Sequence, residues 1–392
     1  MKHYLTGLTA VLFICFSGIR ASAGDTHYVA TNMLSVAPYT SWENAASNIQ
    51  WAVDAATAED MVLVSNGVYD AGGMTNYPLG CVLTTRVVIA KAITVLSVNG
   101  SSVTAIKGAY SSDGHTNGTD AVRCVYMSSL GSLIGFTITN GATSTNLNSV
   151  NRIGGGIYCS STSPIISNCV ITGNSGSDLG AGAYFGAFYN TIVNNNNSPC
   201  STLFYSLLSG CVVSNNVGGS GSGGGQNCNW YNCLITGNTG YYGAVLCNEV
   251  GHWLKNCTIV SNRGGSASSG GMYVWAYTVT VENCVIYDNQ SKNVTAGGGG
   301  GFMFTNCCFT PTNSSAVLPA STNNIESDPQ FVNKDAGDFR LRSYSPCVNA
   351  GTNQSWMTNS FDLDGRQRIR YGTVDMGAYE AIYEGTVYRF GF

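Results

Sequence analysis

A short phrase of alternating apolar and polar positions recurs along the middle of the chain. Each copy carries two core-type positions separated by one residue and ends on asparagine, as in NCVITGN from Asn168 and NCLITGN from Asn232. The asparagines that end the copies are Asn174, Asn196, Asn216, Asn238, Asn262 and Asn289. Their spacings of 22, 20, 22, 24 and 27 residues are typical of a solenoid, in which each repeat packs only on its neighbours.

Alternation within the phrase predicts which residues point into the core. The pairs expected to point inward are Phe136/Ile138, Cys169/Ile171, Thr191/Val193, Cys211/Val213, Cys233/Ile235, Cys257/Ile259, Cys284/Ile286 and Cys307/Phe309. The intervening residues are also apolar, namely Val170, Ile192, Val212, Leu234 and Val285. An apolar outer face is unusual in a solvated sheet, so either this sheet is covered or the assignment of faces is reversed.

A second strand precedes each phrase and follows a glycine-rich corner. The copies are GGIYC at Gly155, GAYF at Gly182, GQNC at Gly225, GMYV at Gly271 and GFMF at Gly301. Their expected core residues are Cys159, Phe185, Cys228, Val274 and Phe304, and their expected outward column is Tyr158, Tyr184 and Tyr273, continued by Trp275 and Tyr277. A third strand is expected near residues 164–167. The period therefore predicts coils of about three strands, each pairing in parallel with its copy in the next coil.

The two ends of the chain differ from the repeat. The first 23 residues predict a cleaved signal peptide and a secreted or cell-surface protein. They contain the charged Lys2, an apolar run from Leu5 to Ile19 and an A-x-A site that ends at Ala23. Ile49, Val53 and Ala56 form one helical face, as an N-terminal cap requires. The expected organisation is a signal peptide over 1–23, a cap and first coils over 24–120, a repeat β-helix over 121–316, and a closing cap or appended module over 317–392.

Asparagine and cysteine columns are expected to stabilise the coils. Asparagine tolerates left-handed turns, and identical amides stacked at the strand spacing bond along the axis. An even count of fourteen cysteines after Cys15 invites a disulfide interpretation. However, Cys169, Cys211, Cys233, Cys257, Cys284 and Cys307 share one repeat position, where stacked side chains run parallel ~4.8 Å apart. We therefore expect a column of buried free thiols. Ladder packing is also favoured over glycosylation at the Asn256 sequon.

The amino-acid composition excludes some classes of binding partner. Charged residues make up 10% of the chain and the net charge is −4, so no basic surface suggests nucleic acid. No stretch after the signal peptide approaches ~20 consecutive apolar residues, so the mature chain is expected to lack a transmembrane span. The 49 glycines fit a chain that turns constantly, and the plentiful apolar residues argue against disorder.

Several stretches resemble known families. IQWAVDAA followed by DMVLVSNGVY resembles the start of right-handed parallel β-helix proteins of the pectate-lyase-like superfamily. DPQF, DFRLRSYSPCVNAG and FDLDG with VDMGAYE are similar to secreted bacterial β-helix proteins of the choice-of-anchor Q type, and the repeats are similar to those of chlamydial polymorphic outer-membrane proteins. The chain departs from these families in its last residues, AIYEGTVYRFGF, where neither an apolar anchor nor an autotransporter barrel is expected.

The resemblance implies an all-β, right-handed parallel β-helix of about ten coils, with three strands per coil, an N-terminal helical cap and a C-terminal β cap. Such folds carry polysaccharide lyases, glycoside hydrolases and non-catalytic adhesins, so the fold does not decide the function.

Few ionisable residues could support catalysis. Lyases of this fold are expected to need a carboxylate cluster for Ca²⁺ with a basic residue, and hydrolases need two carboxylates ~5–9.5 Å apart. Glu249, His252 and Lys255 lie together in sequence and could form an acid–base group, or equally a solvated turn. Lys255 and Glu282 share one offset from the phrase, which predicts a cross-strand ion pair, and Asp178 lies in a glycine turn.

No cofactor is predicted, and Ca²⁺ is the ion that would be possible. Asp362 and Asp364 are its candidate ligands, but two acids fall short of the usual 6–8 oxygen ligands, so a structural turn is favoured.

The outward column of Tyr158, Tyr184, Tyr273 and Trp275 is the stronger functional indication, although β-propensity alone also explains aromatic residues in strands. The sequence thus favours a protein that binds or displays along its long face, with polysaccharide or a cell-surface glycan as partner. One alternative is a polysaccharide lyase or glycoside hydrolase. A second is a protein-binding adhesin that uses the apolar column from Val170 to Val285.

Overall fold

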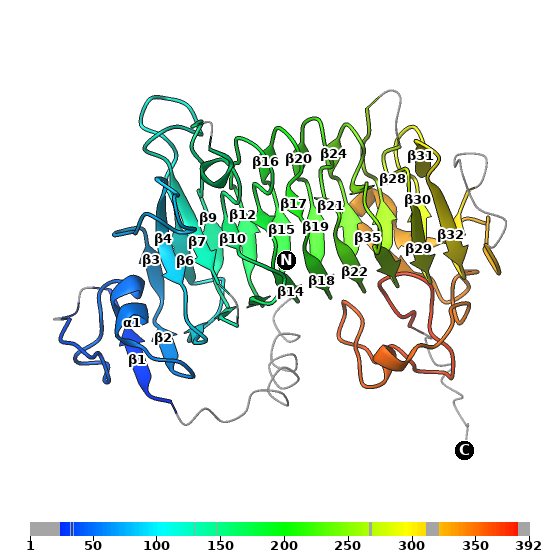
Figure 1. Ribbon diagram of the computed structural model, residues 1–392. Helices are drawn as coiled ribbons and strands as arrows, with labels where there is room; N and C mark the ends of the chain where they lie inside the picture. The colour runs from blue at the N-terminus through cyan, green and yellow to red at the C-terminus, as the bar shows by residue number, and fades with distance from the viewer. Residues whose placement is uncertain are drawn as a thin grey trace, which may run out of the picture.

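The computed structural model describes residues 24–382 except 32, 34, 129, 147, 266–268 and 311–320. The predicted signal peptide lies outside the described residues. Three long sheets of parallel strands run the length of the molecule, and each coil adds one strand to each sheet in turn (Figure 1). Connections between parallel strands of one sheet are right-handed. The chain is therefore a right-handed parallel β-helix, as the repeat and the resemblance predicted.

Sheet A is formed by the strand that comes immediately before each phrase. Its members are β1 (Thr26–Val29), β2 (Met61–Val64), β5 (Thr94–Ser97), β8 (Ser132–Ile134), β11 (Ile165–Ser167), β14 (Ala187–Tyr189), β18 (Leu207–Ser209), β22 (Asn229–Tyr231), β26 (Trp253–Lys255), β29 (Thr278–Glu282) and β32 (Gly301–Thr305). Strand β11 is the third strand of the period that the sequence placed near residues 164–167.

Sheet B is formed by the phrases themselves. Its members are β3 (Gly67–Tyr69), β6 (Thr104–Lys107), β9 (Thr137–Thr139), β12 (Val170–Thr172), β15 (Ile192–Asn194), β19 (Val212–Ser214), β23 (Leu234–Thr236), β27 (Thr258–Val260), β30 (Val285–Tyr287) and β33 (Cys308–Phe309). Each phrase pairs in register with the next, as in Ile171 with Val193.

Sheet C contains the glycine-preceded strands. Its members are β4 (Thr84–Ile89), β7 (Val122–Met127), β10 (Ile157–Cys159), β13 (Ala183–Tyr184), β17 (Leu203–Phe204), β21 (Gly225–Gln226), β25 (Val245–Cys247), β28 (Met272–Trp275) and β31 (Val294–Gly297). A small separate sheet lies between sheets B and C along the chain. It consists of the short strands β16 (Asn197–Ser198), β20 (Val217–Gly218) and β24 (Thr239–Gly240), which pair with one another.

The remaining elements lie at the two ends of the coil, apart from one turn in a loop between coils. Helix α1 (Ile49–Ala55) begins after Asn48, whose side chain caps it, and buries Ile49 and Val53 on the first coils. The 3₁₀ turn η3 (Ser149–Asn151) lies in a loop beside sheet C. The C-terminal segment carries the antiparallel pair β34 (Phe331–Asn333) and β35 (Asp338–Leu341) and the turns η5 (Lys334–Ala336) and η6 (Ser355–Met357).

The inward residues predicted from the phrase form the core. All of them are buried, with Phe309 the most exposed at 3%. The second-strand prediction needs two corrections. Phe185 is only partly buried, because it follows the end of β13 at a left-handed turn. GFMF forms β32 of sheet A, because the left-handed Gly298 and Gly299 turn the chain after β31, which supplies that coil's sheet C strand.

The asparagines that end the phrases form a continuous buried ladder. In each step the backbone N–H and the side-chain Nδ2 both donate to the Oδ1 of the next asparagine, at 3.0 and 2.9 Å from Asn174 to Asn196. At the far end Asn289 Nδ2 donates to Asn293 Oδ1 at 3.1 Å. One detail of the prediction was wrong. The left-handed residue is the one before each ladder asparagine, such as Asn195 or Gly237, because that turn directs the next side chain inward.

The repeated cysteines form a second column, at the start of each sheet B strand, as stacked thiols. All fourteen cysteines of the described residues are free in this structure. Each repeated cysteine is buried, and thiols such as Cys284 donate to the carbonyl two residues earlier, at 3.2 Å from Glu282. Burial raises the pKa of Cys169 to about 11, so its thiol is protonated near neutral pH.

The C-terminal segment folds back along sheet B, which explains the apolar outer face of the phrases. Leu234, Val260, Val285 and Cys308 project outward from sheet B into a second apolar cluster. The segment supplies the other members of the cluster, namely Phe331, Phe339, Leu341, Cys347, Met376 and Ala381. Figure 1 shows this segment in orange and red beside the last coils. The assignment of faces was therefore correct, and the sheet is covered in its C-terminal half.

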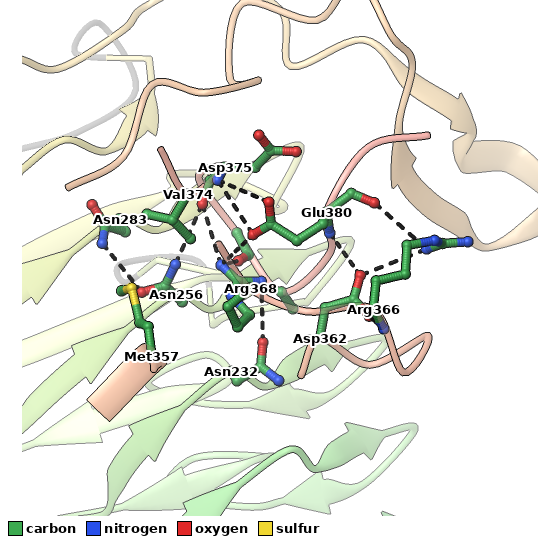
Figure 2. A network of polar contacts seen from close by, with 12 residues as sticks. Asn232, Asn256, Asn283, Met357, Asp362, Arg366, Arg368, Val374, Asp375 and Glu380 are labelled. Carbon is green, nitrogen blue, oxygen red and sulfur yellow. Dashed lines mark hydrogen bonds and ion pairs between the residues drawn. The ribbon is translucent and has the colours of Figure 1, made fainter. Parts of the chain in front are cut away.

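A buried polar network attaches the segment to the coils (Figure 2). Arg368 is fully buried, and its Nη2 lies 3.2 Å from Glu380 Oε1 and 3.0 Å from the Gly377 carbonyl. Its Nη1 donates to Asn232 Oδ1 at 3.3 Å. Asn256 and Asn283, at the same repeat position as Asn232, donate to carbonyls of the segment. These phrase-initial asparagines adopt left-handed turns, which leave their amides free to face the segment.

The network makes stability depend on pH. Burial raises the pKa of Glu380 to about 8 from 4.5, and Arg368 only partly opposes this. Burial also raises the pKa of Asp362 and of Asp375. The folded chain then retains a proton that the unfolded chain releases, so the stabilisation is complete below pH 4.5 and is lost as pH rises through about 8. We expect the wild-type Tm to fall over this window.

The substitution Glu380→Gln should flatten that part of the Tm profile, because an amide cannot titrate. Glu326→Gln is the matched control, since Glu326 is exposed on the same segment. Thermal melts from about pH 5 to about pH 9 provide the measurement. Parallel pH profiles for wild type and Glu380→Gln would show that Glu380 does not control the transition.

Candidate functional site

The outer face of sheet C carries a run of aromatic side chains, one per coil. Strand register places Tyr126 beside Tyr158, then Tyr184, then Phe204. Their ring centroids are 5.7, 5.2 and 5.5 Å apart, and Tyr77 extends the run at 5.6 Å from Tyr126. We refer to these five residues as the aromatic ladder. The ladder exists because parallel in-register pairing stacks identical positions along the axis.

The accessible members of the ladder are Tyr158, Tyr184 and, at its end, Tyr77. Tyr126 and Phe204 are each only 8% exposed, whereas Tyr158 and Tyr184 are half-buried. Burial raises the pKa of Tyr158 to about 12, so its phenol is neutral near pH 7. Among the residues that the structure describes, the phenols of Tyr158 and Tyr184 have no hydrogen-bond partner. They can therefore bond to a ligand.

A buried arginine packs against the aromatic ladder and bonds to the loops beside it. The Arg123 guanidinium is fully buried and lies 5.1 Å from the ring centroid of Tyr158, as a cation–π contact. It donates to the carbonyls of Gly154 at 3.0 Å and of Tyr77 at 3.2 Å. These bonds fix the two loops that flank the ladder, so the rings are held before any ligand arrives.

A second pair of rings turns the corner from sheet C toward sheet A. Phe185 and Tyr205 stack at 5.3 Å, and both adopt left-handed backbone turns. The ring of Tyr205 meets Phe204 at 4.3 Å, which joins this pair to the ladder. The Tyr205 phenol donates to the carboxylate of Glu249, an exposed residue. The aromatic surface therefore ends beside a carboxylate.

The three candidate catalytic residues bind different partners. Glu249 contacts Tyr205, whereas Lys255 forms the predicted ion pair with Glu282 at 2.9 Å in neighbouring strands of sheet A. His252 Nδ1 lies 3.4 Å from Asn229 Oδ1. Burial lowers the pKa of His252, against a smaller opposing effect of Glu249, so the ring is neutral near pH 7. Glu249 and His252 are neighbours, but Lys255 belongs to a different contact.

The other acidic candidates serve structural contacts. Asp178 lies 3.9 Å from Arg152 and 3.5 Å from the Cys200 thiol, at the glycine turn where the sequence placed it. Asp362 accepts backbone N–H groups from Asp364 and Glu380. Arg366 pairs with both Asp362 and Asp364. A guanidinium at this position repels a cation, so these residues do not fit a Ca²⁺ site.

Tyr273 and Trp275 do not continue the aromatic ladder. Gln226 and Leu246 occupy the ladder position in the two intervening coils. Tyr273 is 8% exposed and packs against Tyr242 at 4.7 Å, whereas Trp275 is 49% exposed. The four aromatic candidates therefore form two groups, and only Tyr158 and Tyr184 belong to the ladder.

Sequence reasoning missed Tyr77, Tyr126, Phe204 and Tyr205. Tyr126 was detectable, because VRCVYM alternates before the first clear repeat. Phe204 and Tyr205 follow SPCSTL, which lacks the glycine corner that marked the other copies. Tyr77 lies in a loop, and only the fold brings it to the ladder.

Comparison with known proteins agrees with this architecture. No protein-family model and no curated protein match the sequence. Among solved structures, the chain is similar to pectate lyase Pel9A, with a TM-score of 0.53 and 16% identity over 92% of this chain and 98% of that one. The chain has the same fold. A pectin methylesterase in complex with a hexasaccharide also matches, with a TM-score of 0.34 and 13% identity over 74% of this chain and 80% of that one.

At this identity the likeness to Pel9A concerns the fold alone. The similarities to choice-of-anchor Q proteins and to polymorphic outer-membrane proteins stay predictions. No helix among the described residues is long and apolar enough to cross a membrane.

Proposed function

We propose that this protein is exported and binds a linear polysaccharide along the aromatic ladder without cleaving it. The observation that carries the proposal is the row of part-exposed tyrosines, one per coil, on a rigid face of sheet C. Tyrosine offers a flat apolar surface with a polar tip, which suits sugar rings. A polymer that lies along the axis of the rod would meet successive rings.

The contacts of the ionisable residues favour binding over cleavage. A lyase or hydrolase needs its acid and base to converge on one reacting bond. Here Lys255 is paired with Glu282, and Glu249 is bonded to Tyr205. Fold similarity to a pectate lyase is consistent with a polysaccharide partner but does not supply catalytic residues.

In the protein-adhesin alternative, the C-terminal segment already covers much of the proposed contact surface on sheet B. Leu234 and Val285, which belong to the apolar column on sheet B, are buried beneath the C-terminal segment. Ile192 remains exposed at 40%, and Val170 and Val212 are partly exposed. Three residues of the column therefore remain accessible, far fewer than the ~20–30 residues that each side of a specific protein interface uses.

Replacing Tyr184 tests the proposed surface. Affinity gels that contain polygalacturonate, alginate, xylan or a β-glucan measure retention of the folded protein. We expect Tyr184→Ala to weaken retention on the bound polymer by about tenfold, because one ring contact is worth ~0.5–1.5 kcal/mol beyond its buried area. Tyr184→Phe should lose less, because it keeps the ring.

Tyr344→Ala is the matched control, since Tyr344 is 68% exposed on the C-terminal segment rather than on sheet C. Equal retention of Tyr184→Ala and wild type would contradict the proposed site. Equal losses in Tyr184→Ala and Tyr344→Ala would show that retention is not specific to the ladder.

A further inference from the structure

The charged residues around the aromatic ladder are few, and they balance one another. The sheet C strands from β10 to β31 contain no Lys, Arg, Asp or Glu. In the connections that lead into and out of β10, β13, β17 and β21, the charged residues are Arg152 and Asp178. Their side chains lie 3.9 Å apart as an ion pair. The strands and connections that present Tyr158 and Tyr184 therefore carry no net formal charge.

The buried guanidinium that contacts Tyr158 is fully occupied by protein groups. Arg123 Nη2 donates to the carbonyls of Val150 and Ile153 at 2.8 and 2.9 Å. Its Nη1 donates to Thr85 Oγ1 at 3.2 Å, and its Nε donates to a loop carbonyl. The side chain is also 0% exposed. This cation is therefore not free to bind a carboxylate on a ligand.

Beyond Phe204 the ladder position is taken by an amide rather than by a charged group. Gln226 is part-exposed there, its Oε1 accepts from Ser201 Oγ at 2.8 Å, and its Nε2 lies 3.4 Å from Asn248 Oδ1. Amides and hydroxyls donate and accept hydrogen bonds without a net charge, as the hydroxyls of a neutral sugar do. This face of sheet C therefore combines aromatic rings with uncharged polar groups.

Glu249 places a negative charge at the end of the aromatic surface. Its exposed carboxylate accepts from the Tyr205 phenol, and the Tyr205 ring contacts Phe204 of the ladder. This bond is to a neutral phenol, so it does not cancel the charge. Like charges repel over roughly 8 Å at physiological ionic strength. A polyanion that lies along the ladder would be repelled at this end.

We propose that the aromatic ladder takes an uncharged polysaccharide, such as a β-glucan or an unsubstituted xylan, and that Glu249 disfavours polyuronates. The inference rests on the proposed function, because it requires that a polymer binds the ladder. Sugar rings stack on the tyrosines, and sugar hydroxyls bond to the phenols of Tyr158 and Tyr184 and to the Gln226 amide. A polyuronate would lose hydration of its carboxylates on this face without a cation to offset the cost.

Affinity gels of a neutral β-glucan, unsubstituted xylan, polygalacturonate and alginate test the proposal at NaCl concentrations from about 0.05 to about 0.5 M. We expect retention of the wild type on a neutral polymer, with less than about a twofold change across this range, and no retention on the two polyuronates. Retention on a polyuronate that Tyr184→Ala weakens would overturn the neutral ligand but keep the ladder as the binding site. Retention on a neutral polymer that Tyr184→Ala leaves unchanged, or retention on no polymer, would contradict the proposed function itself.

Reversing the charge at the end of the aromatic surface provides a second test. We expect Glu249→Lys to raise retention on polygalacturonate by about fivefold at low salt, and the gain to vanish at about 0.5 M NaCl. Glu326→Lys is the matched control, since Glu326 is exposed on the C-terminal segment. No gain in Glu249→Lys, or an equal gain in both variants, would show that Glu249 does not select against polyuronates.

Discussion

Replacing Arg368 with methionine is expected to lower the free energy of unfolding by about 3–5 kcal/mol and to release the C-terminal segment from the coils. Arg368 is 0% exposed and faces Glu380, Asn232 and two backbone carbonyls. Methionine fills a similar volume but leaves Asn232 Oδ1 and the Gly377 carbonyl without this donor, while Glu380 keeps the backbone N–H of Asp375. A buried polar group that loses its partner retains the full cost of its desolvation.

Chemical denaturation measures the loss, and limited proteolysis reports where it occurs. Cleavage should appear first between residues 321 and 382, because the coils keep their own core. Arg370→Met is the matched control, since Arg370 is exposed two residues away. The interpretation of the network fails if the two variants unfold alike, or if cleavage begins within the coils.

Replacing Asn238 with alanine is expected to cost about 3 kcal/mol of stability, centred on its coil. Asn238 Oδ1 accepts from the backbone N and the Nδ2 of Asn216, and its own Nδ2 donates to Val213 O and Asn262 Oδ1. Alanine leaves the buried N–H of Asn216 without an acceptor. Because solenoid stability is a sum of neighbouring terms, the effect should stay local.

Hydrogen exchange resolves this local effect. The amide of Asn216 should exchange much faster in Asn238→Ala, while amides of the first coils keep wild-type rates. Thr239→Ala is the control, since Thr239 is the next residue and is exposed. Unchanged exchange at Asn216 would show that the ladder hydrogen bonds contribute little.

The coils could be predicted from the sequence because the interactions that define them are local and repeat in every copy. A residue such as Ile171 or Ile235 reveals its inward direction through alternation within five residues, and each copy repeats the signal. The same reasoning placed Asn196 correctly in the ladder but assigned the left-handed turn to it rather than to Asn195. Asn195 takes the left-handed turn and Asn196 the ladder position, but both are compatible with either role by residue type.

Long-range docking was not readable. The apolar outward positions of Leu234 and Val285 raised the possibility of a covered sheet, but their local pattern did not indicate that residues 321–382 cover it. Phrase-initial asparagines such as Asn256 looked like ordinary repeat residues, yet they bond to that segment. The candidate site was found in part for the same reason. Tyr158 and Tyr184 follow the glycine pattern, whereas Tyr77 reaches the ladder only through the fold.

The docked C-terminal segment gives the faces of the β-helix different roles. The C-terminal segment packs on sheet B and on the corner between sheets A and B. The aromatic ladder lies on sheet C, which takes no part in that corner. The segment therefore stabilises one face and leaves the ladder accessible for a ligand.

Retention and turnover measured together on one panel of polysaccharides test the central claim most directly. The wild-type protein is incubated with polygalacturonate, alginate, xylan and a β-glucan, with and without Ca²⁺. Products are followed by ultraviolet absorbance of unsaturated ends and by reducing-sugar release, and binding by affinity gels. The proposed function predicts retention on at least one polymer with no product from any. Product that appears with wild type and is lost in Glu249→Gln would contradict the claim and identify an enzyme.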